Sequence, residues 1–264
     1  MEMKKGILKA ANALVNLIVI VSLGLAGIYS AFALWDNNRI YAAAEGVQAD
    51  MIKLKPEIQI TEEDSGADFS ELLAINRDVC GWISMDNTEI DYPILQGETN
   101  LTYINTDVYG KFALAGSIYV DSRNSRDFTN TFSLLYGHHM ENSRMFGDLD
   151  LYKDEEFFNS NPTGTLILPD RAYNLEIFSC LLVKASDHMI FDPIQWQDEN
   201  INELLTYIQE HAMYVHDNIL NELAQSREPV QILALSTCST EFTDARTILL
   251  TVMRPYAETE QGGK

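Results

Sequence analysis

Positive charge is scarce in this chain, and that scarcity narrows the possible partners. The chain has 18 lysine and arginine residues against 39 aspartate and glutamate residues, so its formal net charge is -21 at pH 7. Nucleic-acid binding needs a basic surface that neutralises phosphates, and this composition argues against it. An acidic, soluble, extracellular surface is the simpler interpretation.

Cysteine is also rare, with only Cys80, Cys180 and Cys238 in the whole chain. Their wide spacing contains no CxxC pair, and no cluster of acids and histidines has ligand spacing, so we expect no metal and no cofactor. A secreted domain stapled by disulfides usually has more cysteines. Cys80 and Cys180 lie in apolar, strand-like runs and are expected to be buried. Cys238 differs, because it ends such a run among hydroxyl residues.

Charged residues are missing from Ala10 to Trp35. At about 1.5 Å per helical residue this run exceeds the roughly 30 Å of bilayer hydrocarbon, which predicts a transmembrane anchor. Lys4 and Lys5 precede it and predict a cytoplasmic N-terminus, with the rest of the chain outside the cell. The alternative is a cleaved signal peptide, since residues 31–33 resemble a cleavage site. The apolar run is longer than a usual signal peptide, which favours a retained anchor.

The chain after this run divides into segments of different texture. We expect residues 1–9 in the cytoplasm, a transmembrane anchor over 10–35, a stalk and linker over 36–68, a folded domain over 69–256 and a C-terminal tail over 257–264. The tract 62–66 is acidic and ends in glycine, which is typical of a linker. A short helix is expected near 69–75.

Short strands dominate the expected folded domain. A hairpin is predicted over 82–92 around a two-residue turn at Asp86 and Asn87. Further strands are expected at 116–120, 131–136, 163–168, 173–183, 230–237 and 247–252. One long helical segment over 198–223 precedes the strand that leads to Cys238. About eight short strands with few helices predict a mainly β fold, a closed eight-stranded barrel with N-terminal helices and a helical insert.

The end of the strand at Cys238 has the features of a nucleophile site. Two adjacent strands would place Cys238 and Arg246 at one rim of a sheet. A thiol attacks as thiolate, and an imidazolium nearby favours that form, so His138 at the end of another strand is the best candidate base. Arg246 would stabilise an oxyanion in acyl transfer. Simpler interpretations exist: His138 as a structural residue, and Arg246 in a salt bridge with Asp244 or Glu241.

Six segments together resemble a class B sortase over nearly all of 69–253. They are DVCGWI at 78–83, IDYPILQ at 90–96, GSIYVD at 116–121, YGHHM at 136–140, MFGDL at 145–149 and LSTC at 235–238. The resemblance implies a membrane-anchored cysteine transpeptidase of a Gram-positive cell surface. Such an enzyme cleaves a pentapeptide sorting signal after threonine and transfers the protein to an amine of cell-wall precursor or of a pilin. A thiol peptidase that acts by hydrolysis and a non-catalytic sortase-like module are the alternatives.

The resemblance also implies residue roles. Its catalytic positions fall on Cys238 as nucleophile, His138 as acid and base, and Arg246 as the oxyanion cation. Its substrate-groove positions fall on Asn100, Ile104, Ile190, Ser236 and Thr237. Two departures bear on specificity and mechanism: Met189 stands where some class B enzymes have tyrosine, and Thr240 stands where others have an acid. The implied partners are surface proteins with a C-terminal sorting signal and the amine acceptor.

Overall fold

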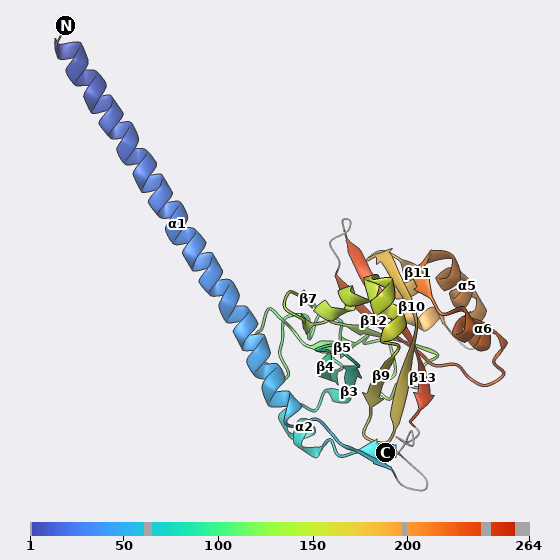
Figure 1. The fold of residues 1–264 in the computed structure, drawn as a ribbon. Helices are drawn as coiled ribbons and strands as arrows, with labels where there is room; N and C mark the ends of the chain where they lie inside the picture. Colours follow the sequence, from blue (N-terminus) through green and yellow to red (C-terminus); the bar gives the residue numbers. More distant parts are fainter. Residues whose placement is uncertain (1, 61–64, 197–199, 239–243, 257–264) are drawn as a thin grey trace, which may run out of the picture. The chain divides into compact units, whose positions relative to one another are not determined.

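The computed structural model describes residues 2–60, 65–196, 200–238 and 244–256. It separates into two compact units, 1–43 and 44–264. The first unit is the N-terminal part of helix α1 (Glu2–Ile52). Among the described residues, α1 is long and apolar enough to cross a membrane (Figure 1). The expected anchor at 10–35 lies inside this helix, and the Ala-rich residues that follow it continue the same helix without a break.

The second unit is built on a closed barrel, which confirms the predicted fold class. Its eight strands follow the order β10-β13-β12-β6-β5-β4-β3-β9, and β9 pairs back onto β10 (Figure 1). Their bounds are β3 (Val79–Met85), β4 (Asp91–Leu95), β5 (Ile118–Val120), β6 (Phe132–Tyr136), β9 (Thr163–Ile167), β10 (Ala172–Lys184), β12 (Ile232–Cys238) and β13 (Ala245–Pro255).

Strand β10 closes the barrel because it has two partners on one edge. Its first half, 172–176, pairs with β9, and residues 179–181 pair with β11 (Ala212–Val215). Its other edge pairs with β13 along nearly its whole length. Most residues of β10 are buried, as expected for a strand covered on both faces along much of its length.

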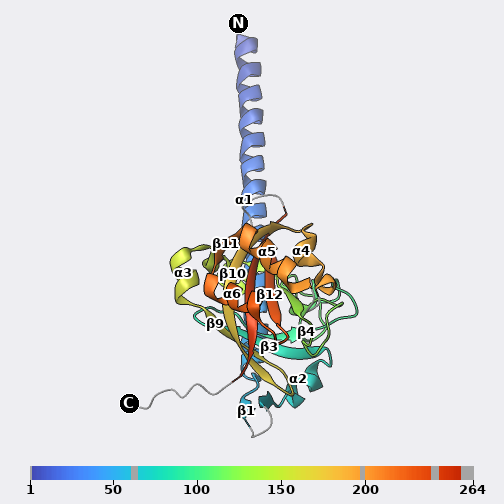
Figure 2. The same cartoon turned by 90° about the vertical axis from the view of Figure 1, so that its right-hand side faces the viewer.

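The prediction of one long helix over 198–223 is wrong. The segment forms α5 (Ile201–His211), strand β11 and α6 (Asp217–Gln225). The four residues of β11 satisfy their backbone groups on the free edge of β10, and this pairing outweighs the helical pattern. Both helices bury apolar side chains against the outer surface of the barrel, beside β10 and β12 (Figure 2).

The predicted hairpin at 82–92 exists with a longer connection. Pairing of β3 with β4 ends at Ser84 and Asp91, so the loop is 86–90 rather than two residues. Asp86 and Asn87 do form the turn, in which the Thr88 amide donates to the Met85 carbonyl at 3.3 Å. Asn87 takes a left-handed φ of 59°, which asparagine tolerates better than most residues.

Part of the expected stalk packs into the second unit. Met51, near the end of α1, is 1% exposed and belongs to a buried cluster with Phe69 and Trp82. Strands β1 (Ile58–Ile60) and β2 (Ser65–Ala67) pair with each other, and α2 (Ser70–Ile75) follows. The expected acidic linker falls mostly on 61–64, outside the described residues. The shorter elements are β7 (His139–Met140), β8 (Arg144–Met145), η1 (Gly147–Lys153), α3 (Glu155–Ser160), α4 (His188–Phe191) and η2 (Pro193–Gln195).

Candidate active site

Strands β12 and β13 bring Cys238 and Arg246 together as the sequence predicts. The two strands are antiparallel, and Cys238 is in register with Arg246, one step beyond the pair Thr237 and Thr247. The structure describes Cys238 through its backbone, while its side chain and residues 239–243, including Thr240, lie outside the description. The pairing therefore places the thiol-bearing residue and the guanidinium-bearing residue on neighbouring strands at one rim of the barrel.

His138 follows directly on the strand next to β12. Strand β6 runs parallel to β12 with Tyr136 in register with Ser236, and the Gly137 amide donates to the Ser236 carbonyl at 3.1 Å. A Cβ at Gly137 would lie 2.5 Å from the Cδ1 of Ile118 and 2.7 Å from the ring of Phe146, so a larger residue here would require these side chains to move. The residue after it, His138, is thereby held beside the end of β12.

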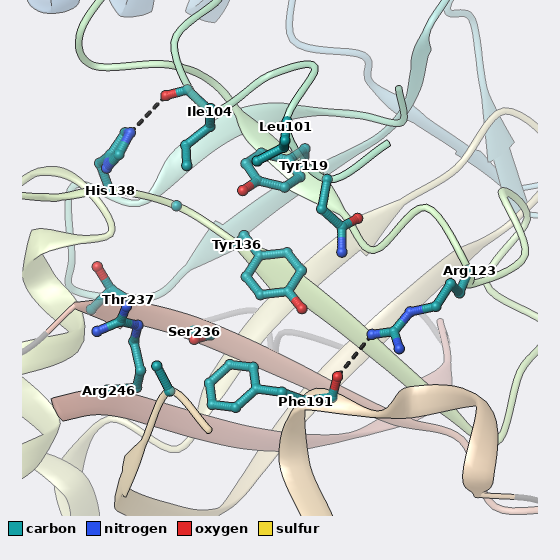
Figure 3. Close-up of a pocket in the computed structure, with 13 residues that line it drawn as sticks. Leu101, Ile104, Tyr119, Arg123, Tyr136, His138, Phe191, Ser236, Thr237 and Arg246 are labelled. Carbon is teal, nitrogen blue, oxygen red and sulfur yellow. Dashed lines mark hydrogen bonds between the residues drawn. The ribbon is translucent and has the colours of Figure 1, made fainter. Parts of the chain in front are cut away.

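The ring of His138 is fixed by a backbone acceptor. Its Nε2 lies 2.6 Å from the carbonyl oxygen of Ile104 (Figure 3). A carbonyl oxygen only accepts, so this nitrogen carries the hydrogen of the bond. The loop between β4 and β5 therefore sets the orientation of the imidazole.

These residues surround one cleft of about 390 Å³. Figure 3 shows side chains from the β4–β5 loop, β6, β12 and β13 that converge on it. The residues that line it are Asn100, Leu101, Ile104, Tyr119, Arg123, Tyr136, Gly137, His138, Ala185, Phe191, Ser236, Thr237 and Arg246. Seven of the predicted positions are thus brought to one place: six line the cleft, and Cys238 follows Thr237 in the chain.

Ile190 is the exception among the predicted groove residues. Its side chain is 0% exposed and belongs to the buried cluster between the barrel and α5. Helix α4 turns Ile190 into this core and presents the next residue, Phe191, to the cleft. The expectation for Ile190 is therefore corrected to Phe191. Met189, the departure from the sortase pattern, also packs against the buried cluster.

An aromatic wall forms one side of the cleft and was not predicted. The rings of Tyr119 and Tyr136 stack at 5.3 Å, and those of Tyr136 and Phe191 stack at 6.4 Å. The Tyr136 hydroxyl donates to Asp121 at 2.9 Å. Burial and the neighbouring Asp121 carboxylate raise the pKa of Tyr136 well above its usual range, so the phenol stays neutral. This wall offers an apolar, rigid surface to an occupant of the cleft.

Asp121 is a buried carboxylate that organises the same wall. It accepts hydrogen bonds from Arg123, from the Asn100 amide at 2.9 Å and from Tyr136. Burial alone would raise its pKa, but the hydrogen bonds from Arg123 and its other donors outweigh burial and hold the pKa below the usual range. The Asn100 side chain also accepts from the Ser122 amide at 2.7 Å. Asn100 therefore lines the cleft while its side-chain amide is hydrogen-bonded to Asp121 and Ser122.

Arg123 joins two walls of the cleft. Its Nη1 donates to Asp192 at 2.9 Å, and its Nη2 donates to the Phe191 carbonyl at 2.8 Å (Figure 3). The described lining residues include three basic residues, Arg123, Arg246 and His138, and no acidic residue. In a chain of net charge -21 this cleft suits a group that gains negative charge during a reaction.

Within the described part of the chain, Arg246 does not form the alternative salt bridge with Asp244. Arg246 Nη1 donates to the Ala245 carbonyl at 2.9 Å, and Glu241 lies outside the described residues. Cys80 and Cys180 are free and buried, which confirms the expectation for both. Burial raises the pKa of each thiol to about 12. Neither is a thiolate at neutral pH.

Comparison with known proteins adds independent findings. The chain matches no protein-family model. It is 30% identical to Sortase B of Listeria monocytogenes over 174 residues, which cover 66% of this chain and 68% of that protein. It is 28% identical to Sortase B of Staphylococcus aureus over 211 residues, 78% of this chain and 84% of that protein. A class B sortase of Streptococcus pyogenes involved in pilus biogenesis superposes with a TM-score of 0.64 at 35% identity, covering 71% of this chain and 98% of that one.

Proposed function

The chain belongs to the class B sortases, a family of cysteine transpeptidases, and we propose that Cys238, His138 and Arg246 are its catalytic residues. The observation that carries the proposal is the register of Cys238 with Arg246, next to a β6 end that delivers His138. His138 and Arg246 come from separate parts of the chain and line one cleft, and Cys238 directly follows Thr237, which also lines it.

The proposed reaction proceeds through a thioester. The Cys238 thiolate attacks the carbonyl carbon of a threonine in the sorting signal, and Arg246 stabilises the negative charge on the carbonyl oxygen. His138 protonates the amine that leaves when the peptide bond breaks. It later removes a proton from the incoming amine, which attacks the thioester and releases the thiol.

We propose that the cleft holds a pentapeptide sorting signal in extended form. Five extended residues span about 17 Å, and the proposed groove is framed by β12, the β4–β5 loop and α4. Ile104, Leu101 and Phe191 offer apolar contacts, and Ser236 and Thr237 line the cleft just before the nucleophile in the chain.

We further propose that residues 10–35 of α1 anchor the enzyme in the cell membrane with its N-terminus in the cytoplasm. The apolar helix and the preceding lysines support this arrangement. The substrates would be surface proteins with a C-terminal sorting signal, and the acceptor an amine of cell-wall precursor or of a pilin. In a Cys238→Ala background, a membrane-impermeant thiol reagent added to intact cells tests the orientation, because a cysteine introduced at Ser226 should react and one introduced at Lys5 should not.

A peptide assay tests the proposed chemistry. Wild type should cleave a peptide with a sorting signal, and an added amine should convert product from acid to amide. Cys238→Ala and His138→Ala should lose activity while keeping the melting temperature. If Cys238→Ala retains activity, the proposal is wrong; if added amine never enters the product, hydrolysis rather than transfer is the reaction.

A further inference from the structure

Behind the cleft, one carboxylate contacts both strand ends that carry proposed catalytic side chains. In η1, Asp150 Oδ1 accepts a hydrogen bond from the Thr247 hydroxyl at 3.3 Å. Its other oxygen, Oδ2, lies 3.0 Å from His139 Nε2. His139 directly follows His138, and Thr247 directly follows Arg246. We infer that Asp150 is a positioning residue that holds His138 and Arg246 in fixed relation. The inference rests on the proposed roles of those two residues.

The two partners of Asp150 lie outside the lining of the cleft. His138 and Arg246 line it, whereas His139 and Thr247 do not. Consecutive side chains of a strand point to opposite faces, so Arg246 and Thr247 diverge in this way on β13. Thr247 is 0% exposed. A contact on the far face therefore fixes the backbone that aims each catalytic side chain without reaching the substrate.

The partners of Asp150 favour the charged form of its carboxylate. Its Oδ1 also forms an ion pair with Lys153 Nζ at 2.9 Å. Burial alone would raise the pKa of Asp150, but the hydrogen bonds from His139 and Lys153 outweigh burial and lower it. The hydrogen bond to Asp150 in turn raises the pKa of His139. Near neutral pH the carboxylate can therefore accept all three donors together.

The remainder of η1 supports the same arrangement. The amide of Phe146, at the start of η1, donates to the His138 carbonyl at 3.0 Å. A Cβ at Gly147 would lie only 2.1 Å from the Met140 carbonyl oxygen, so the backbones of η1 and β7 are in direct contact. Segment 146–150 therefore touches the histidine segment at its backbone and, through Asp150, at a side chain.

This arrangement matters more for catalysis than for folding. Both Asp150 and His139 are partly exposed, with side-chain exposures of 32% and 25%, and ion pairs of that kind contribute little to stability. Misplacement of a catalytic group by about 1 Å can lower a rate about 100-fold. Loss of Asp150 should thus reduce turnover in a protein that remains folded.

Steady-state kinetics of the full chain with a sorting-signal peptide test the inference. Asp150→Ala should lower kcat about 10- to 100-fold, with KM changed less than about twofold, and Asp150→Asn should lie between it and wild type. Thr247→Val should lower kcat, and Thr247→Ser, which keeps the hydroxyl, should restore it. Glu176→Gln is the matched control, because it removes another carboxylate partner of β13, in the Arg254–Glu176 ion pair of 3.3 Å, away from the cleft.

The outcomes separate this inference from the proposed function. An unchanged kcat in folded Asp150→Ala overturns it, and so does an equal loss in Glu176→Gln. If Asp150→Ala fails to fold, the Thr247→Val and Thr247→Ser pair decides, since equal kcat in the two overturns the inference. Activity in Cys238→Ala would instead refute the proposed chemistry. Loss in Cys238→Ala with full activity in Asp150→Ala would leave that chemistry standing and refute only the positioning role.

Discussion

The two buried thiols define a background against which Cys238 can be measured. Burial raises the pKa of Cys80 and Cys180 to about 12, so both remain protonated and unreactive at neutral pH. Iodoacetamide at pH 7.5 should therefore label native wild type once, at Cys238, and native Cys238→Ala not at all. After unfolding in urea, Cys238→Ala should take up two labels. Labelling of Cys80 or Cys180 in the native variant would contradict the burial of these two thiols.

The fold leaves no room for a side chain at Gly147. A Cβ there would meet the Met140 carbonyl oxygen at 2.1 Å, and backbone cannot move aside as a side chain can. Gly147→Ala should lower the free energy of unfolding by about 1–3 kcal/mol and reduce turnover, since it displaces the segment after His138. Urea denaturation measures the first effect, and the peptide assay measures the second.

Gly46→Ala is the control for that substitution. Gly46 lies in helix α1, and no atom lies within 4 Å of the position that an added methyl group would occupy. Alanine favours a helix over glycine by up to about 1 kcal/mol. The variant should be as stable as wild type or slightly more so. A loss of stability in Gly46→Ala as large as in Gly147→Ala would contradict the steric explanation.

Among single residues, the sequence indicated the proposed catalytic residues better than the residues that position their surroundings. Cys238, Arg246 and His138 each follow or precede a recognisable strand within a short motif. Asp121 and Asp150 were missed, because their partners are far away in the chain and no local pattern announces them. Ile190 was assigned to the groove from the family resemblance, which does not resolve the single-residue shift along α4 between a core side chain and the cleft side chain of Phe191.

Among the elements, the last turns of α1 belong physically to the barrel unit. Met51 is buried, Gln48 donates to the Glu89 carbonyl at 2.9 Å, and Arg144 pairs with Glu45 at 3.0 Å. The Arg144 contact reaches β8, which is the strand paired with β7 just after His138. The helix therefore contributes to the core and to the hairpin beside the candidate site.

A truncation series tests this contribution. A chain that begins at Ala44 should keep the stability of the barrel unit, whereas one that begins at Ile58 should lose it in large part. In the longer chain Met51→Ala should cost about 2–5 kcal/mol of unfolding free energy, because it leaves a cavity in a packed core. Thermal melts of the three proteins measure the effect. Equal melting temperatures for the chains starting at Ala44 and Ile58 would show that α1 is only a spacer.

The elements also show where sequence patterns stop being informative. Apolar spacing over 198–223 matched a helix, yet residues 212–215 form a strand, because an unpaired edge of β10 was available to them. The turn at Asp86 and Asn87 was recognisable from local chemistry, whereas the start of β4 at Asp91 depends on pairing with β3. Local propensity thus located the elements, and tertiary pairing decided their limits.

At the scale of the whole molecule, the number of strands predicted a barrel. The barrel is closed by the pairing of β9 with β10. The number of short strands and the scarcity of helices indicated the fold class, and the observed order confirmed it. No local signal could show that β10 serves two partners on one edge, since that arrangement requires strands distant in sequence. The separation into two units at residue 44 likewise reflects contacts that no composition reveals.

Stability of the whole molecule should depend on pH through its carboxylates. The pKa values of Asp121 and Asp150 lie below their ordinary 3.8 when folded, so each contributes stability above pH 3.8 that is lost as pH falls through the folded value. The pKa of His139 is raised above 6.5, so its contribution is complete below pH 6.5 and is lost as pH rises through the folded value. The melting temperature should therefore peak at weakly acidic pH and fall steeply below pH 4.

Added salt should stabilise the protein at pH 7. The net charge of -21 repels itself at pH 7, and added salt screens that repulsion. Raising sodium chloride from low to moderate concentration at pH 7 should therefore raise the melting temperature. A melting temperature that falls with salt, or one that stays constant from pH 7 to pH 3, would contradict this electrostatic description.

The proposed function depends above all on a covalent acyl-enzyme between Cys238 and a sorting-signal peptide. Intact-protein mass spectrometry of the full chain, quenched during turnover of a peptide library, detects that species directly. We predict adducts that each add the mass of a library peptide from its N-terminus through threonine less one water, located on Cys238 by digestion and absent from Cys238→Ala. Peptide turnover by wild type with no adduct, or by Cys238→Ala at the wild-type rate, would contradict the proposed function.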